Sequence, residues 1–212
     1  MKKELFFILI VFFSCKRDDK VEKVDDFWNW FKNNKIEFQD KSFEEYNLSD
    51  SIYQRTKFID PDISITLSKD SIGRTYKMLI SAGGQEKCFE SVQLIKSRAP
   101  HFKDFEVIAF TPRSRATTIE IEYTNGKICS EDVFFSYEKV ENSKLINLNI
   151  YAKNFNNTNI FKAITSELIL HIAGEWDAVK SINNINYYSI NDTINHKVYK
   201  ITKLAKIIDE NK

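Results

Sequence analysis

The spacing of hydrophobic residues along the chain predicts short strands that alternate with amphipathic helices. In the first half, three apolar segments have the length and alternation of strands. They are Ile63–Ser68, Thr75–Ala82 and Phe105–Thr111. Gln85–Ala99 carries apolar residues at helical spacing and stops before Pro100, so we expect a helix there. A weaker helical pattern covers Ser42–Ile59.

The second half of the chain repeats this order. Strands are expected at Val133–Tyr137, Leu145–Ala152, Ala178–Ile182 and Ile185–Ser189. A helix is expected over Ile160–Ala173, because Gly174 stands where glycine often ends a helix. Before these elements, Ile119–Tyr123 alternates and leads into Asn125-Gly126, which is typical of a hairpin turn. A short helix is expected over Lys200–Asp209.

The repeated order of strand, strand, helix and strand predicts a pseudo-duplicated fold of the α+β class. We expect two layers, with a mixed or antiparallel sheet and helices packed on one of its faces. Each half contributes only about 80 residues, which is small for an independent domain. Residues 27–212 are therefore predicted to form a single domain.

The first helix of this domain is expected to begin at Asp25 or Asp26, since either side chain can cap it. The aromatic segment that follows, Phe27–Phe31, places apolar residues at helical spacing. Within it, Trp30 is expected in the core and Trp28 at an exposed edge.

The first fourteen residues have the parts of a bacterial export signal. Two lysines give a positive start, and Leu5–Phe13 is an apolar run of nine residues, far below the roughly 20 that span a membrane. Ser14 and Cys15 follow, and this order resembles a bacterial lipoprotein signal, in which the peptidase cuts before a cysteine that carries diacylglycerol. Residues 1–14 are thus expected to be a signal peptide, and Cys15 to be lipidated. The alternatives are an export signal with an incidental cysteine and a buried N-terminal helix.

The segment after Cys15 is charged and is expected to connect the lipid to the domain. Residues 15–26 read CKRDDKVEKVDD, a composition typical of a solvated tether. Two or more acyl chains hold a protein stably on a membrane, whereas one does so only marginally. The start, CKRDD, resembles the signal that directs some Bacteroidota lipoproteins to the cell surface. The resemblance implies an outer-membrane lipoprotein of the cell envelope, on its surface-exposed or its periplasmic side.

Composition and charge argue against several classes of protein. The 212 residues carry a formal net charge of +1, with 31 Lys and Arg against 30 Asp and Glu. A chain without a basic excess lacks the electrostatic signature of a nucleic-acid-binding protein, so no nucleic-acid partner is expected. Only 5 Gly and 3 Pro argue against a disordered or fibrous chain.

Five short segments also occur in an order that resembles a family of uncharacterised bacterial proteins. They are FWNWF at residues 27–31, ISAGG at 80–84, AP at 99–100, VIAFTPR at 107–113 and GEW at 174–176. The resemblance covers roughly Asp26 to Ile190. It implies the α+β fold and no catalytic residues.

Two places in the sequence are candidates for binding an anion. Gly83 and Gly84 stand between a strand and a helix start, where free backbone N–H groups can bind a phosphate or carboxylate. Arg113 and Arg115 alternate in TPRSRA, so an extended chain points both side chains toward one acidic ligand. The structural alternatives are a tight strand-to-helix turn for the glycines and a solvated strand end for the arginines.

The remaining polar clusters carry weaker signals. Glu120 and Glu122 share one face of a strand, which is typical of the solvent side of a sheet. Glu167 and His171 are four residues apart on a helix, but no second histidine is near them in sequence. Neither a metal nor another cofactor is expected, and no catalytic residue is assigned.

Three functions from different classes follow from these patterns. The first is a lipid-anchored envelope lipoprotein that acts as a binding or accessory module, with a protein or small anionic partner. The second is an enzyme that acts on a phosphate- or carboxylate-bearing substrate through Arg113, Arg115 and a carboxylate. The third is an immunity-type protein that binds and blocks a toxin.

Overall fold

The computed structural model describes residues 19–40, 46–69, 75–123, 126–153, 155–193 and 197–212. Its α-helices are α1 (Asp19–Asp40), α2 (Tyr46–Ile59), α3 (Phe89–Ser97), α4 (Asn159–Ala173), α5 (Glu175–Ser181) and α6 (Leu204–Asn211). Its strands are β1 (Ser64–Lys69), β2 (Tyr76–Ser81), β3 (Phe105–Ala109), β4 (Glu120–Tyr123), β5 (Gly126–Cys129), β6 (Val133–Lys139), β7 (Ile146–Ala152), β8 (Ile182–Ser189) and β9 (Tyr199–Lys200). The predicted α+β class is confirmed.

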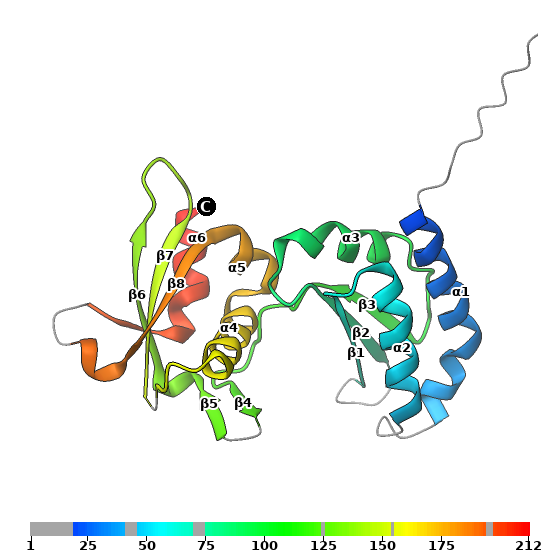
Figure 1. The fold of residues 1–212 in the computed structure, drawn as a ribbon, viewed down its shortest axis with the longest axis horizontal. Coiled ribbons are helices and arrows are strands. Elements are labelled where there is room, and N and C mark those ends of the chain that lie inside the picture. Colours follow the sequence, from blue (N-terminus) through cyan, green and yellow to red (C-terminus); the bar gives the residue numbers. More distant parts are fainter. Residues whose placement is uncertain (1–18, 41–45, 70–74, 124–125, 154, 194–196) are drawn as a thin grey trace, which may run out of the picture.

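The two halves of the molecule share one topology (Figure 1). In the first half, β1 pairs antiparallel with β2, and β2 pairs parallel with β3 across helix α3. In the second half, β6 pairs antiparallel with β7, and β7 pairs parallel with β8 across α4 and α5. The predicted repeat of strand, strand, helix and strand is therefore present. The described strands form three separate sheets, in the orders β1-β2-β3, β4-β5 and β8-β7-β6-β9.

Each half has its own hydrophobic core. The first core gathers buried residues of α1, β2, α3 and β3, among them Phe31 and Met78. The second gathers residues of β6, β7, α4 and α6, among them Phe135 and Leu148. Helix α5 contributes to both cores, because Ala178 belongs to the second and its neighbour Val179 packs against the first.

Helix α1 begins at Asp19, six residues before the first expected start at Asp25. Val24 is completely buried, and Asp25 binds the guanidinium of Arg98 through two hydrogen bonds. Residues 19–26 are thus helix, and the prediction of a solvated tether over 15–26 is wrong for them. The reason is that Val24 lies one turn before Phe27 and extends the apolar stripe of the helix.

The tryptophans of α1 are placed in the reverse of the predicted order. Trp28 is buried, and its indole N–H donates a hydrogen bond to the carbonyl of Ile95 over 2.8 Å. Trp30 is only partly buried, with the Arg55 guanidinium 4.5 Å from its ring centre. The buried stripe of α1 has the spacing i, i+3, i+4 and i+7 from Val24, which includes Trp28 and excludes Trp30.

The segment predicted as a strand at Ala178–Ile182 belongs mostly to a helix. Helix α5 follows α4 directly, and the two are separated only by Gly174 with φ 81° and ψ 135°. Glu175 and Asp177 stand in its first turn, where negative charge is favourable to a helix. The apolar pair at 178–179 faces the two cores rather than the two sides of a sheet. Among the described helices, none combines the length and the hydropathy that a membrane span requires.

Candidate functional site

Cys15, the predicted lipidation site, lies outside the described residues. The structure does place the other candidate residues. Gly83 and Gly84 form the turn after β2, and both adopt positive φ, at 57° and 76°. The N–H of Gly83 donates to the hydroxyl of Ser81, and the N–H of Gly84 donates to a carboxylate oxygen of Glu175 over 3.0 Å. The turn therefore binds a carboxylate, and that carboxylate belongs to the protein itself.

Glu175 is completely buried at the junction of the two halves. Besides the Gly84 contact at Oε1, its Oε2 accepts the hydroxyl of Ser81 at 2.9 Å and the N–H of Thr111 at 2.8 Å. Its own N–H donates to the Thr111 carbonyl over 2.8 Å. The Glu175 side chain of α5 thus forms hydrogen bonds to the end of β2, to the glycine turn and to the segment after β3. These bonds hold the first half of the molecule against the second.

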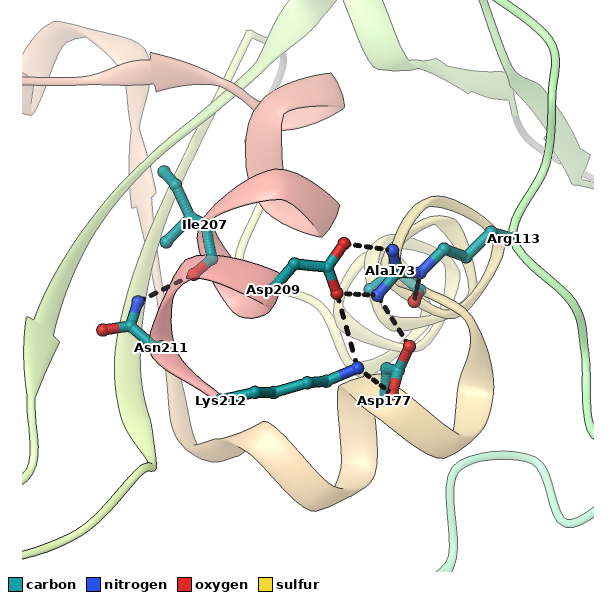
Figure 2. Close-up of polar contacts among 7 residues, drawn as sticks. All are labelled: Arg113, Ala173, Asp177, Ile207, Asp209, Asn211 and Lys212. Carbon is teal, nitrogen blue, oxygen red and sulfur yellow. Dashed lines mark hydrogen bonds and ion pairs between the residues drawn. The ribbon is translucent and has the colours of Figure 1, made fainter.

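Arg113 points at acidic side chains of the second half (Figure 2). Its Nε donates to the carbonyl of Ala173 over 2.7 Å, and its two terminal nitrogens bind both oxygens of Asp209 at 2.7 and 2.8 Å. One of these two nitrogens, Nη2, also donates to a carboxylate oxygen of Asp177 over 2.6 Å. The other oxygen of Asp177 accepts a hydrogen bond from the ammonium group of Lys212, also over 2.6 Å. The guanidinium is engaged on every nitrogen, so it binds the protein's own carboxylates instead of a ligand.

Arg115 is exposed, and none of the hydrogen bonds that hold Arg113 involves it. The structure therefore does not bring the two arginines together on one ligand. Hydrogen bonds and charge pairing with Arg113 lower the pKa of Asp209 from 3.8 to about 2. The same contact with Asp209 raises the pKa of Arg113. Both shifts favour the charged forms of Arg113 and Asp209. The cluster therefore has a structural role, because it joins the segment after β3 to α6.

The lowered pKa of Asp209 predicts how Asp209→Asn changes stability with pH. A carboxyl whose pKa is lower in the folded chain stabilises it above the unfolded pKa and loses this effect as the pH falls through the folded pKa. The side chain is half exposed, so we expect a loss below about 1 kcal/mol at pH 7. The difference from wild type should fade between pH 4 and 2. Urea midpoints across this range measure it, and Glu210→Gln on the same helix is the control for the loss of one negative charge.

The weaker candidates also have local partners. Glu120 pairs with Lys127 across the β4–β5 hairpin at 3.0 Å, and Glu167 lies 3.3 Å from His171 on α4. Cys88 and Cys129 are both free thiols. Cys88 is buried as predicted, and burial raises the pKa of its thiol. It lies near Asp60 and Asp62, whose carboxylates already face Lys20, Ser91 and Lys87.

A further surface, which the sequence analysis missed, lies on the second sheet. Three side chains of β7 pair in register with three identical side chains of β8. The pairs are Asn147 with Asn184, Asn149 with Asn186, and Tyr151 with Tyr188. We call these six residues the Asn–Tyr face. Alternate residues of the same strands, such as Leu148 and Ile150, are buried in the second core with α4 and α6.

The Asn–Tyr face forms a groove with a volume of about 450 Å³. Its lining also includes Glu138 of β6 and Asp192, which follows β8. The amide of Asn186 donates to Asn149 over 3.1 Å, and that of Asn149 donates to Ser136 at 3.4 Å. The rings of Tyr151 and Tyr188 stack with centres 5.5 Å apart.

The signal for this face was present in the sequence. Each strand contains the pattern Asn-x-Asn-x-Tyr, as NLNIY at residues 147–151 and NINYY at residues 184–188. Alternation within one strand shows only that the three residues share a side. That the two patterns lie side by side depends on the parallel register of β7 and β8, which single-strand periodicity does not give.

Comparison of the chain with protein-family models, with curated proteins and with solved structures found no match. The resemblance to uncharacterised bacterial proteins accordingly stays a prediction from the sequence. The assignment of function therefore rests on the geometry of the described residues and, for the membrane anchor, on the sequence around Cys15.

Proposed function

We propose that this protein is a lipid-anchored protein of the cell envelope that acts by binding, and that the Asn–Tyr face is its binding surface. The observation that carries the proposal is the in-register pairing of two Asn-x-Asn-x-Tyr strands along a groove of about 450 Å³. Amide and phenol groups recognise a ligand by hydrogen bonds and ring contacts without chemical reaction. The anchor is the lipid expected on Cys15, which we place at the outer membrane.

Two of the groups that are candidates for binding an anionic substrate, Arg113 and the Gly83–Gly84 turn, already bind carboxylates of the protein itself. Arg113 is held by Asp177 and Asp209, and the Gly84 N–H is bound by Glu175. An anionic substrate would have to displace these internal carboxylates, which are already charge-paired or hydrogen-bonded. Binding therefore fits the geometry better than catalysis on an anionic substrate. A toxin-blocking role would instead need a protein partner on this face, so the class of ligand that the face binds distinguishes the two roles.

The anchor predicts an all-or-none effect of Cys15→Ser. Cells that express the wild-type chain should incorporate a clickable palmitate analogue into it, because the acyl chains are attached at this cysteine. The Cys15→Ser chain should incorporate none and should leave the membrane fraction. Cys129→Ser is the matched control, since it removes a partly exposed thiol of the domain and should label like wild type. Equal labelling of wild type and Cys15→Ser would contradict the proposal.

A further inference from the structure

The ligand class of the Asn–Tyr face can be argued from its chemistry. We propose that this face binds a neutral carbohydrate chain, with hydroxyl groups on the amide rows and a sugar ring on Tyr188. The inference rests on the proposed binding function and names its ligand.

The charge of the groove disfavours an anionic ligand. The described residues that line it include two acids, Glu138 and Asp192, and no lysine or arginine. Recognition of phosphate or carboxylate relies on basic side chains, which are missing from this lining. Carboxylates in the lining instead accept hydrogen bonds from hydroxyl groups, which are the donors that a neutral sugar presents.

The amides of the face retain hydrogen-bonding capacity. An asparagine side chain has two N–H donors and a carbonyl oxygen with two lone pairs. Asn149, Asn184 and Asn186 each donate one hydrogen bond to a neighbour on the sheet, which leaves a second N–H on each. Because every amide both donates and accepts, the rows match hydroxyl groups, which do the same. The partner bonds along the sheet hold these amides in place before a ligand arrives.

Tyr188 supplies the apolar contact that a sugar needs. It is 39% exposed, whereas Tyr151 beside it is 3% exposed. The stacking of the two rings fixes the plane of Tyr188 on the edge strand of the sheet. A pyranose ring has a face of C–H groups that packs against an aromatic ring while its hydroxyl groups point sideways. The amide rows next to Tyr188 lie where those hydroxyl groups would be.

The repeat of the face favours an extended chain over a single sugar. Residues two apart on a strand are separated by about 6.6–6.8 Å, so the three pairs form a row that runs along β7 and β8. The centre of a protein–protein interface is enriched in aromatic, Met and Arg side chains, and this face has one exposed ring among amides. A carbohydrate therefore fits the face better than a protein partner does.

The test titrates neutral hexasaccharides of glucose, mannose and N-acetylglucosamine into the purified full chain in detergent, by calorimetry. At least one should bind with a dissociation constant of about 1 mM or tighter. Tyr188→Ala should weaken that binding at least about tenfold. Asn186→Ala, which removes an amide and keeps the ring, should weaken it severalfold. Tyr53→Ala is the control, because Tyr53 is exposed on α2 in the other half and should bind like wild type.

Three outcomes would overturn the inference. They are no binding of any hexasaccharide, binding that both face variants retain, and capture of an envelope protein by a photo-crosslinker at position 184 in a chain that binds no sugar. The last outcome would favour the toxin-blocking role. Thermal unfolding of each variant shows that it is folded, and Asn186→Ala keeps the test decisive if Tyr188→Ala fails to fold. Since the titration does not depend on lipidation, its failure is distinct from a failure of the Cys15 labelling.

Discussion

Glu175→Ala should lower the free energy of unfolding by roughly 3–5 kcal/mol, the largest effect expected of any polar residue in the described part of the chain. The carboxylate is completely buried and accepts three hydrogen bonds, from Ser81, Gly84 and Thr111. Removing it leaves two backbone N–H groups without their acceptor and a cavity at the junction of the halves. Urea unfolding followed by circular dichroism measures the loss.

Glu175→Gln separates the hydrogen bonds from the volume of the side chain. The amide nitrogen must replace either Oε1, which faces the N–H of Gly84, or Oε2, which faces the N–H of Thr111. Either orientation places two donors against each other, so we expect a loss of about 1–3 kcal/mol without a cavity. Glu167→Ala on the exposed side of α4 should change stability by less than about 0.5 kcal/mol. A Gln variant as stable as wild type would show that the carboxylate is not what holds the junction.

The junction also shows what the sequence can and cannot predict at a site. The glycine turn is a candidate for binding a carboxylate or phosphate, with a tight strand-to-helix turn as the alternative. Its geometry follows from local residues, because Gly83 and Gly84 both take positive φ. Its partner Glu175 lies 91 residues away from Gly84. Nothing in local periodicity pairs two such positions, because the pairing is set by how α5 packs between the two cores. For the same reason, the sequence offers Arg113 as a candidate for an acidic ligand or as a solvated strand end, whereas in the structure it binds Asp209.

The order of helices and strands was easier to predict from the sequence than the partners of the site residues. Hydrophobic periodicity is a local property, and it gave the repeated order of elements in both halves because each strand and helix buries one face of its own. It misplaced α5, whose short apolar run at 178–179 serves two cores at once. It also placed Trp28 outside the core, because the stripe of α1 was counted from Phe27 and not from Val24. Both errors come from apolar residues whose partners lie in the other half or in a longer helix.

Phe135→Ala should weaken both halves of the molecule, although Phe135 belongs to the second core alone. The side chain is completely buried, and truncation of a buried phenylalanine costs about 3–5 kcal/mol. If Glu175 and α5 join the two cores into one cooperative unit, the first half must unfold in the same transition. In a Trp176→Phe background, fluorescence reports on Trp28 and Trp30 of the first half. The urea midpoint seen by these tryptophans should fall with the midpoint seen by circular dichroism.

The double variant Phe135→Ala with Glu175→Ala tests whether the Glu175 carboxylate is what makes the two cores unfold together. Without the Glu175 carboxylate, β2 and the segment after β3 lose three hydrogen bonds to α5, while the backbone bond from Glu175 to Thr111 and the apolar contact of Val179 remain. We therefore expect that damage to the second core no longer reaches the first. The tryptophan midpoint of the double variant should then equal that of Glu175→Ala alone, and circular dichroism should show two transitions. If Phe135→Ala leaves the tryptophan midpoint unchanged even with Glu175 present, the halves unfold independently and the buried carboxylate serves the first half alone.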